Sequence, residues 1–225
     1  MNFLIGLPSV DNTANINVIH SLIDQLPYIV AERHAIQCMT VTNTLIHNAR
    51  NQIADAAVER GVDYLFFLDS DCILPEDALK RLVHHDKDIV AGMYFQKRFP
   101  HLPVIYSMNR KGTFDIITDY PADTLIDAGG VGMGVCLIKT SVLKKLGDNP
   151  FEPFPATPGC PAINGEDLAF CKRAKARNFR IYVDTGLQAG HCAERFITEE
   201  YYKAAWADVN KPGRQKLQAK PNAEV

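Results

Sequence analysis

The sequence predicts an α/β fold in which a mostly parallel central sheet is flanked by helices. Through the first hundred residues, short apolar runs alternate with segments whose apolar residues recur every three or four positions. Strands that alternate with amphipathic helices in this way form parallel sheets covered on both faces. The run at 64–68 is apolar at all five positions, as expected for a central strand of such a sheet.

Four strands and three helices are expected in this first part of the chain. The strands cover 3–7, 34–41, 64–68 and 88–94, and the helices cover 15–26, 44–60 and a segment opened by Pro75. Apolar stripes at helical spacing predict the first two helices. Gly61 follows the second helix, where glycine commonly ends a helix, and proline fits the first turn of the third.

The second half of the chain is less regular. Its predicted strands cover 104–108, 114–118, 135–139 and 180–183, and its predicted helices cover 141–146, 166–177 and 198–209. The turn 109–112 joins the first two strands, and a glycine-dense segment at 129–134 leads into the third. Five prolines between 148 and 161 predict an extended loop, and a second loop is expected through His191. We expect one domain at 1–210 and a frayed polar tail at 211–225.

Charge and composition exclude several classes of protein. The net charge is −2, from 24 basic and 26 acidic side chains, so no generic nucleic-acid-binding surface is expected. No apolar run is long enough for a membrane helix, and the N-terminus lacks the basic region of a signal peptide. The six cysteines form no CxxC pair, and several lie in apolar runs, which favours a reducing compartment. The sequence therefore predicts a cytoplasmic protein.

Two carboxylates follow the central strand directly, in the triplet Asp69-Ser70-Asp71. Ligand sites of open α/β sheets lie beyond the carboxyl ends of their strands. Carboxylates there must be hydrated, paired with cations or bound to a metal, because a buried unpaired charge costs too much. Mg²⁺ and Mn²⁺ favour one or two carboxylates together with phosphate oxygens. The triplet predicts a divalent-metal site, although it is also typical of a strand end that caps the next helix.

Two further segments carry candidate functional groups. Gly165-Glu166-Asp167 opens a helix, so its carboxylates are either helix caps or a general base on a rigid element. His191 lies between Gly190 and Cys192 and is either a solvated loop residue or an imidazole ligand of the metal. The spacing of the other cysteines and histidines does not fit a zinc site.

Taken together and in this order, these segments resemble the GT-A glycosyltransferases, particularly the family 2-like members. The resemblance covers residues 2–195 and depends on six segments. They are Gly6-Leu7-Pro8-Ser9, Ala49-Arg50-Asn51, Phe66-Phe67-Leu68-Asp69-Ser70-Asp71, the segment 127–134, Gly165-Glu166-Asp167, and His191.

The resemblance implies a GT-A, Rossmann-like nucleotide-diphospho-sugar transferase fold and a role for each segment. Asp69, Asp71 and His191 would hold Mn²⁺ or Mg²⁺, with Asp69 contacting either the ribose or the ion through water. Asp167 would be the base of an inverting enzyme, with Glu166 positioning the acceptor or the helix. Residues near the donor nucleotide and sugar would be Pro8, Ser9, Arg50, Ser70 and Gly130, the last within the segment 130–133; Arg50 could equally be a structural helix residue.

The implied activity is transfer of a sugar from a UDP- or GDP-sugar to an acceptor hydroxyl. Residues 1–100 would bind the nucleotide and residues 101–210 the acceptor, which is a glycan, small molecule, protein or modified nucleic acid. The absence of membrane helices disfavours a processive polysaccharide synthase. A nucleotidyltransferase is one alternative, but the loop Leu7-Pro8-Ser9-Val10-Asp11 lacks the glycines and arginines that bind triphosphates in that class. A non-catalytic nucleotide-sugar-binding module is the other.

Overall fold

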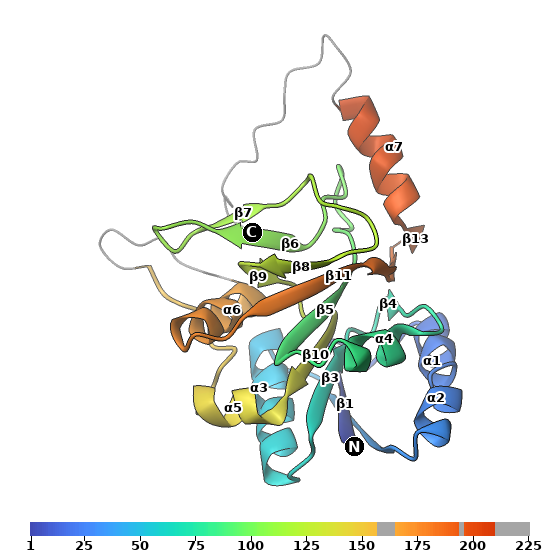
Figure 1. Cartoon of the computed structure of the whole chain (residues 1–225), viewed down its shortest axis with the longest axis vertical. Helices are drawn as coiled ribbons and strands as arrows, with labels where there is room; N and C mark the ends of the chain where they lie inside the picture. The colour runs from blue at the N-terminus through green and yellow to red at the C-terminus, as the bar shows by residue number, and fades with distance from the viewer. Residues whose placement is uncertain (157–164, 194–195, 210–225) are drawn as a thin grey trace.

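A seven-stranded sheet runs through the middle of the protein (Figure 1). In spatial order its strands are β2 (Ala35–Val41), β1 (Asn2–Pro8), β3 (Tyr64–Leu68), β10 (Val135–Lys139), β5 (Ile89–Met93), β11 (Ile181–Gln188) and β8 (Leu125–Ala128). Only β10 and β8 run antiparallel to their neighbours. The mostly parallel α/β fold predicted from the sequence is therefore confirmed. The computed structural model describes residues 1–156, 165–193 and 196–209.

Helices cover both faces of this sheet. On one face lie α3 (Ile46–Glu59), α5 (Thr140–Leu146) and α6 (Glu166–Ala176), and on the other α1 (Ile16–Ile23), α2 (Leu26–Ala31) and α4 (Ala78–His84). Strand β3 shows how the sequence produces two cores. Its side chains alternate, so Phe67 packs in the cluster that contains Ile53 of α3, while Phe66 packs in the cluster that contains Leu79 of α4. All five β3 residues are buried, which explains the unbroken apolar run.

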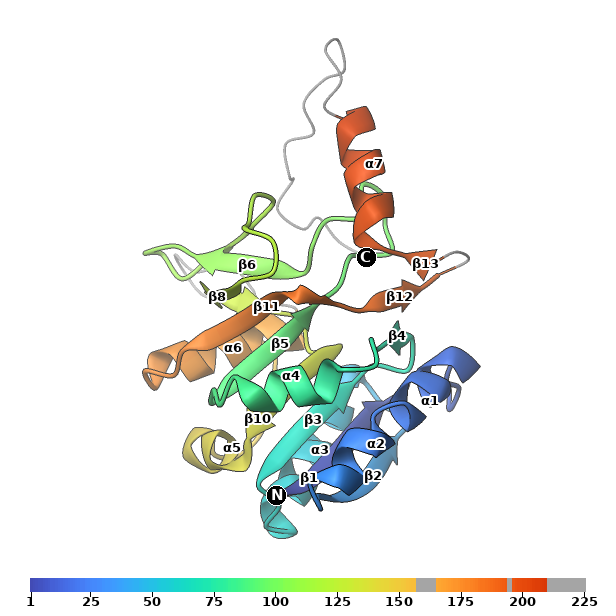
Figure 2. The ribbon, with the colours of Figure 1, turned by 45° about the vertical axis from the view of Figure 1, so that its right-hand side comes forward.

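Two small sheets lie beyond the central one. The first pairs β4 (Cys72–Ile73), β12 (Gly190–Cys192) and β13 (Phe196–Ile197), and the second pairs β6 (Ile105–Met108), β7 (Phe114–Ile116) and β9 (Gly130–Val131). Strand β4 follows the acidic triplet at once, and His191 of β12 is paired directly with Cys72. Backbone pairing therefore brings the late histidine beside the acidic triplet. Helix α7 (Glu199–Val209) stands at the periphery of the fold (Figure 2), where Tyr202 stacks on Phe95.

Some predicted elements differ from the structure. The helix expected at 15–26 is shorter in the structure. Helix α1 ends at Ile23, and a separate helix, α2, begins at Leu26 with Pro27 in its first turn, where proline cannot continue a preceding helix. The loop expected through His191 is wrong, since β11 extends to Gln188 and β12 contains the histidine. The hairpin of β6 and β7 around the turn 109–112 is confirmed. Part of the predicted proline-rich loop, Cys160 and the tail 211–225 lie outside the described residues.

None of the helices in the described ranges is both long and apolar enough to span a bilayer. The five cysteines in those ranges are all free thiols.

Candidate active site

The candidate site lies at the carboxyl end of β3, where Asp69, Ser70 and Asp71 leave the sheet. The loop after β1 approaches from the side, and the backbone N–H of Asn15 donates to the carbonyl of Ser70 at 2.9 Å. Pro8 ends β1, and the hydroxyl of Ser9 donates to the carbonyl of Thr13 at 2.8 Å. Two chain segments predicted to bind the donor thus meet at one edge of the sheet, as parallel strands require.

Arg50 connects three of the carboxylates predicted for the site. Its side chain lies on α3 and is only 2 % exposed. The Nη2 group donates to Oδ1 of Asp69 at 2.9 Å, and Nε donates to Oε1 of Glu166 at 3.1 Å and lies 3.4 Å from Oδ1 of Asp167. The guanidinium carbon lies 5.1 Å from the centre of the Phe67 ring. A permanently charged, forked group suits this position because its several N–H groups can face more than one partly buried carboxylate at once.

The two carboxyl groups at the start of α6 differ in acidity. Burial and the neighbouring charge of Glu166 raise the pKa of Asp167 well above its usual value. Burial alone would raise the pKa of Glu166, but the charge of Arg50 and the hydrogen bonds to this carboxylate together lower it. Among the described residues, Oδ1 of Asp167 is buried without a hydrogen-bond partner. A carboxylate with a raised pKa and an unused acceptor atom has the properties of a general base.

Asp71 lies on the other side of the triplet, between a histidine and a lysine. Nε2 of His191 is 3.4 Å from one carboxylate oxygen, and the ammonium group of Lys97 pairs with the other. Nδ1 of His191 is 2.7 Å from the carbonyl oxygen of Phe95, so the protonated Nδ1 donates to it and Nε2 faces Asp71. Burial opposes ionisation of Asp71, but His191 and Lys97 lower its pKa to about 2.

The donor set at Asp71 fits a hard divalent ion. Ligand atoms of Asp71, Cys72 and His191 lie within 4.8 Å of one another. Two adjacent ligands of one octahedral Mg²⁺ or Mn²⁺ are about 3 Å apart, close to the separation of Nε2 and Oδ1. Burial raises the pKa of the Cys72 thiol well above its usual value, which disfavours a thiolate ligand. Asp69 directs one oxygen to Arg50, and its predicted contact with the ion or ribose stays a prediction.

The structure adds three residues that the sequence analysis did not single out: Tyr94, Lys97 and Gly134. The backbone N–H of Gly134 donates to the hydroxyl of Tyr94 at 3.1 Å, and its carbonyl accepts from the N–H of Asp69 at 2.9 Å. A Cβ at Gly134 would lie 2.9 Å from Sγ of Cys72 and 3.0 Å from Oδ2 of Asp69, so only glycine leaves the carboxylate its place. Tyr94 and Lys97 lie just after the end of β5. Their position beyond the carboxyl end of a strand is the signal in the sequence, although a tyrosine or a lysine there does not by itself indicate a site.

Gly130 has a packing reason for its missing side chain. A Cβ there would lie 2.8 Å from the ring of Phe114 and 2.9 Å from Leu168. The glycine therefore allows β9 to approach both β7 and α6. Its predicted contact with the donor sugar stays a prediction.

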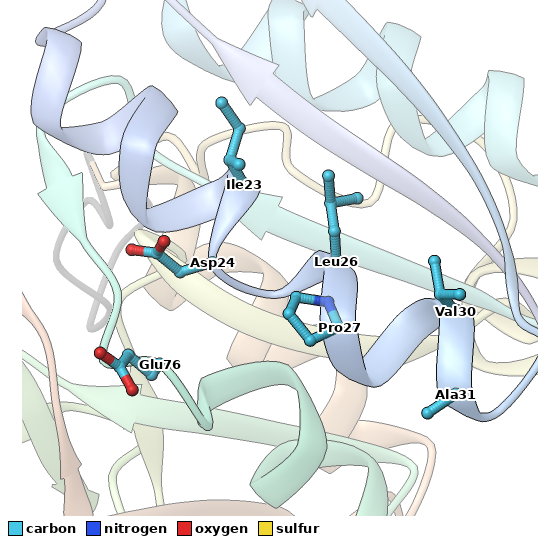
Figure 3. A pocket seen from close by; sticks show the side chains of 7 residues that line it. All are labelled: Ile23, Asp24, Leu26, Pro27, Val30, Ala31 and Glu76. Atoms are coloured by element: carbon cyan, nitrogen blue, oxygen red, sulfur yellow. The ribbon is translucent and has the colours of Figure 1, made fainter.

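A hollow lies elsewhere, between α1, α2 and the start of α4 (Figure 3). Its volume is about 740 Å³, and it is lined by Ile23, Asp24, Leu26, Pro27, Val30, Ala31 and Glu76. This lining is apolar apart from two carboxylates and contains no cation. A diphosphate is not expected to bind in this hollow.

The model of glycosyl transferase family 2 matches residues 18–147, more than half of the chain. The chain belongs to glycosyl transferase family 2. The matched range includes Arg50, the acidic triplet and Lys97, whereas Glu166, Asp167 and His191 lie beyond it.

A solved structure shares the fold of the family 2 chain with little sequence identity. The crystal structure of A197 from STIV is similar with a TM-score of 0.57 and 19 % identity, over 88 % of this chain and 94 % of that one. Mannose-1-phosphate geranyltransferase from Thermus thermophilus is more distant, with a TM-score of 0.44 and 12 % identity, over 89 % of this chain and 76 % of that one. HddC from Yersinia pseudotuberculosis complexed with GMP-PN has a TM-score of 0.43 and 11 % identity, over 92 % of this chain and 99 % of that one. No curated protein sequence matches the family 2 chain significantly.

Proposed function

We propose that this family 2 protein is a divalent-metal-dependent glycosyltransferase, which transfers a sugar from a UDP- or GDP-sugar to an acceptor hydroxyl. One observation carries the proposal. Asp71 and His191, 120 positions apart in the sequence, lie 3.4 Å from each other at the sheet edge where Arg50 joins Asp69 to Glu166 and Asp167. A cation-binding pair and a buried carboxylate pair side by side are what glycosyl transfer to a hydroxyl needs.

The residues have distinct roles in this proposal. Asp71 and His191 bind Mn²⁺ or Mg²⁺, which would offset the negative charge that develops on the diphosphate leaving group. Asp69, fixed by Arg50, orients the ribose side of the donor. Asp167 accepts the proton of the acceptor hydroxyl as its oxygen attacks the anomeric carbon, and the ionised Glu166 holds Arg50 in place. If the enzyme retains configuration, Asp167 binds the acceptor instead.

In the same proposal, the two parts of the chain bind different substrates. Residues 1–100 bind the nucleotide through Pro8, Ser9, Arg50 and Ser70, while residues 101–210 supply the acceptor side and Gly130 lies near the sugar. The protein acts in the cytoplasm on an acceptor that is a glycan, small molecule, protein or modified nucleic acid.

Incubation with Mn²⁺ and a panel of UDP- and GDP-sugars tests the activity. Release of UDP or GDP with transfer or hydrolysis of the sugar supports the proposal. Pyrophosphate release from an NTP and a sugar phosphate would indicate a nucleotidyltransferase, and binding without turnover would indicate a binding module.

Substitution of Asp71 tests the metal site itself. We expect Asp71→Ala to abolish Mn²⁺-dependent nucleotide binding in calorimetry, because it removes the only ionised ligand of the pair. Asp86→Ala is the matched control, since this exposed aspartate is also ion-paired, with Lys139, but lies outside the site. Undiminished Mn²⁺-UDP and Mn²⁺-GDP affinity in Asp71→Ala would refute the ligand assignment.

A further inference from the structure

Lys97 supplies a cation to the carboxylate that the metal is proposed to need. Its ammonium group pairs with Oδ2 of Asp71, while Oδ1 of the same carboxylate faces His191. The lysine and aspartate side chains are 41 % and 34 % exposed. Exposed ion pairs contribute about 0.2–1 kcal/mol to stability. A divalent ion therefore meets a weak competitor at Asp71.

The backbone around Lys97 is fixed, although its side chain is half-exposed. The N–H of Gln96 donates to the carbonyl of Leu102 at 2.9 Å, and the carbonyl of Gln96 lies 2.9 Å from Nδ1 of His101. The preceding carbonyl, that of Phe95, accepts from His191. Movement of the lysine is thus confined to its flexible four-carbon side chain, which keeps the ammonium group within reach of the site.

Arg50 and Lys97 are suited to different tasks. Arg50 is buried and bonded to two carboxylates, so it cannot leave them without exposing unpaired charge. Lys97 has a compact charge on a flexible stem, and lysine commonly binds phosphate as a point charge. A donor diphosphate held at Asp71 would lie beside this ammonium group and attract it.

We propose that Lys97 is a mobile counter-cation of the donor site, which pairs with Asp71 before the metal binds and then turns to the donor diphosphate. The inference rests on the proposed function, because it assigns a phosphate-binding residue to the same site. Lys97 is then a donor-binding residue. Its pairing with Asp71 lowers the affinity for the free ion, and its later pairing with the diphosphate raises the affinity for the nucleotide when the ion is bound.

Calorimetry on Lys97→Met separates these two effects. Titration with Mn²⁺ alone should show about tenfold tighter binding than wild type, because an ion-pair competitor and a repelling charge are removed. Titration of UDP or GDP at saturating Mn²⁺ should show binding weaker by about ten- to a hundredfold, because a charge-assisted hydrogen bond to phosphate is lost. Lys97→Arg should stay within a few-fold of wild type in both titrations.

Lys80→Met is the matched control, since Lys80 is an exposed lysine on α4. It should reproduce the wild-type affinities for Mn²⁺ and for the nucleotides. Opposite shifts of the two affinities in Lys97→Met alone would support the proposal, whereas unchanged affinity for either ligand would overturn it and identify a static surface ion pair.

The failure of this inference is distinguishable from the failure of the proposed function. If wild type binds Mn²⁺ and loses it in Asp71→Ala, but Lys97→Met matches wild type, only the role of Lys97 is wrong. If wild type binds no Mn²⁺ in the presence or absence of nucleotide, the metal-dependent function and the inference both fall.

Discussion

Replacement of Arg50 by methionine tests how the site is held together. Methionine keeps most of the side-chain volume and the contact with Phe67, but removes the charge that pairs with Asp69 and Glu166. Breaking a buried ion pair by removing one partner costs about 3–5 kcal/mol. Since the carboxylates are 24 % and 14 % exposed, they would stay partly buried without a counter-charge. For a domain of this size the loss corresponds to a fall in Tm of roughly 6–20 °C.

Urea unfolding followed by circular dichroism measures this loss directly. The double variant Arg50→Met, Glu166→Gln should recover more than about 1 kcal/mol of it, because the second change removes a carboxylate that no longer has a partner. Without the charge of Arg50 the pKa of Glu166 rises, so the folded state of Arg50→Met binds more protons than the folded state of wild type. The stability of Arg50→Met should therefore fall further as pH rises from 4 to 7.

Arg60→Met is the control at the end of the same helix, since Arg60 is exposed and bonds to Gln37 at the surface. Its stability should stay within about 0.5 kcal/mol of wild type. If the free energy of unfolding of Arg50→Met were within about 1 kcal/mol of the wild-type value at pH 7, Arg50 would not be the residue that holds the site together.

Three further predictions concern other buried groups. Burial and the charge of Glu166 raise the pKa of Asp167. The contribution of this group to the free energy of unfolding is therefore present below pH 3.8 and is lost as the pH rises through its pKa in the folded state. Asp167→Asn should therefore melt no lower than wild type at pH 7, while its sugar transfer falls by about 10²–10⁴-fold and its nucleotide affinity is kept; normal turnover would exclude Asp167 as the base. Asp184 accepts from Arg81 at 2.9 and 2.8 Å, and although burial acts the other way, hydrogen bonds from Arg81 and His85 lower its pKa below 3.8. The contribution of Asp184 to the free energy of unfolding is present above pH 3.8 and is lost as the pH falls through its pKa in the folded state. Asp184→Asn should therefore lower the free energy of unfolding by about 2–4 kcal/mol at pH 7 and by progressively less below pH 4. Urea titrations at several pH values measure this difference. Gly134→Ala should displace Asp69 and cost about 1–3 kcal/mol together with a loss of nucleotide affinity, whereas Gly165→Ala, which has open space for its methyl group, should leave nucleotide affinity unchanged; equal nucleotide affinities of the two variants would contradict the packing argument.

Much of the fold followed from hydrophobic patterning alone. The run at 64–68 predicted a central strand, and β3 is buried at every position because helices cover both faces of the sheet. Patterning failed where tertiary pairing decides the structure. Strand β12 contains Gly190, His191 and Cys192, too short and too polar to show a strand period, and it is extended because it pairs with β4. Strand β8 was missed for a similar reason, since it forms at the edge of the sheet against β11.

Some residues of the candidate site could be predicted from the sequence, and others could be identified only from the fold. The end-of-strand rule placed Asp69 and Asp71 at the edge of the sheet, and their partner His191 was suggested by resemblance. Lys97 could not be chosen from residue type, because a lysine after a strand is common. Its importance depends on a contact with Asp71 that only the fold produces. Gly134 belongs to the glycine-dense segment of the sequence. A glycine is required there because Asp69, Cys72 and Tyr94 leave no room for a side chain.

Burial also explains why the site uses two different cations. Arg50 touches Asp69 on the donor side and Glu166 and Asp167 on the acceptor side, so one fixed charge belongs to both halves of the proposed reaction. Any change in the charge of Glu166 must therefore alter the field at Asp69, even though the two residues are 97 positions apart in the sequence. Lys97 touches only the donor side and is exposed enough to move. In the proposed reaction, Arg50 would therefore be the cation that fixes the geometry of the site, and Lys97 the mobile cation that binds the leaving group.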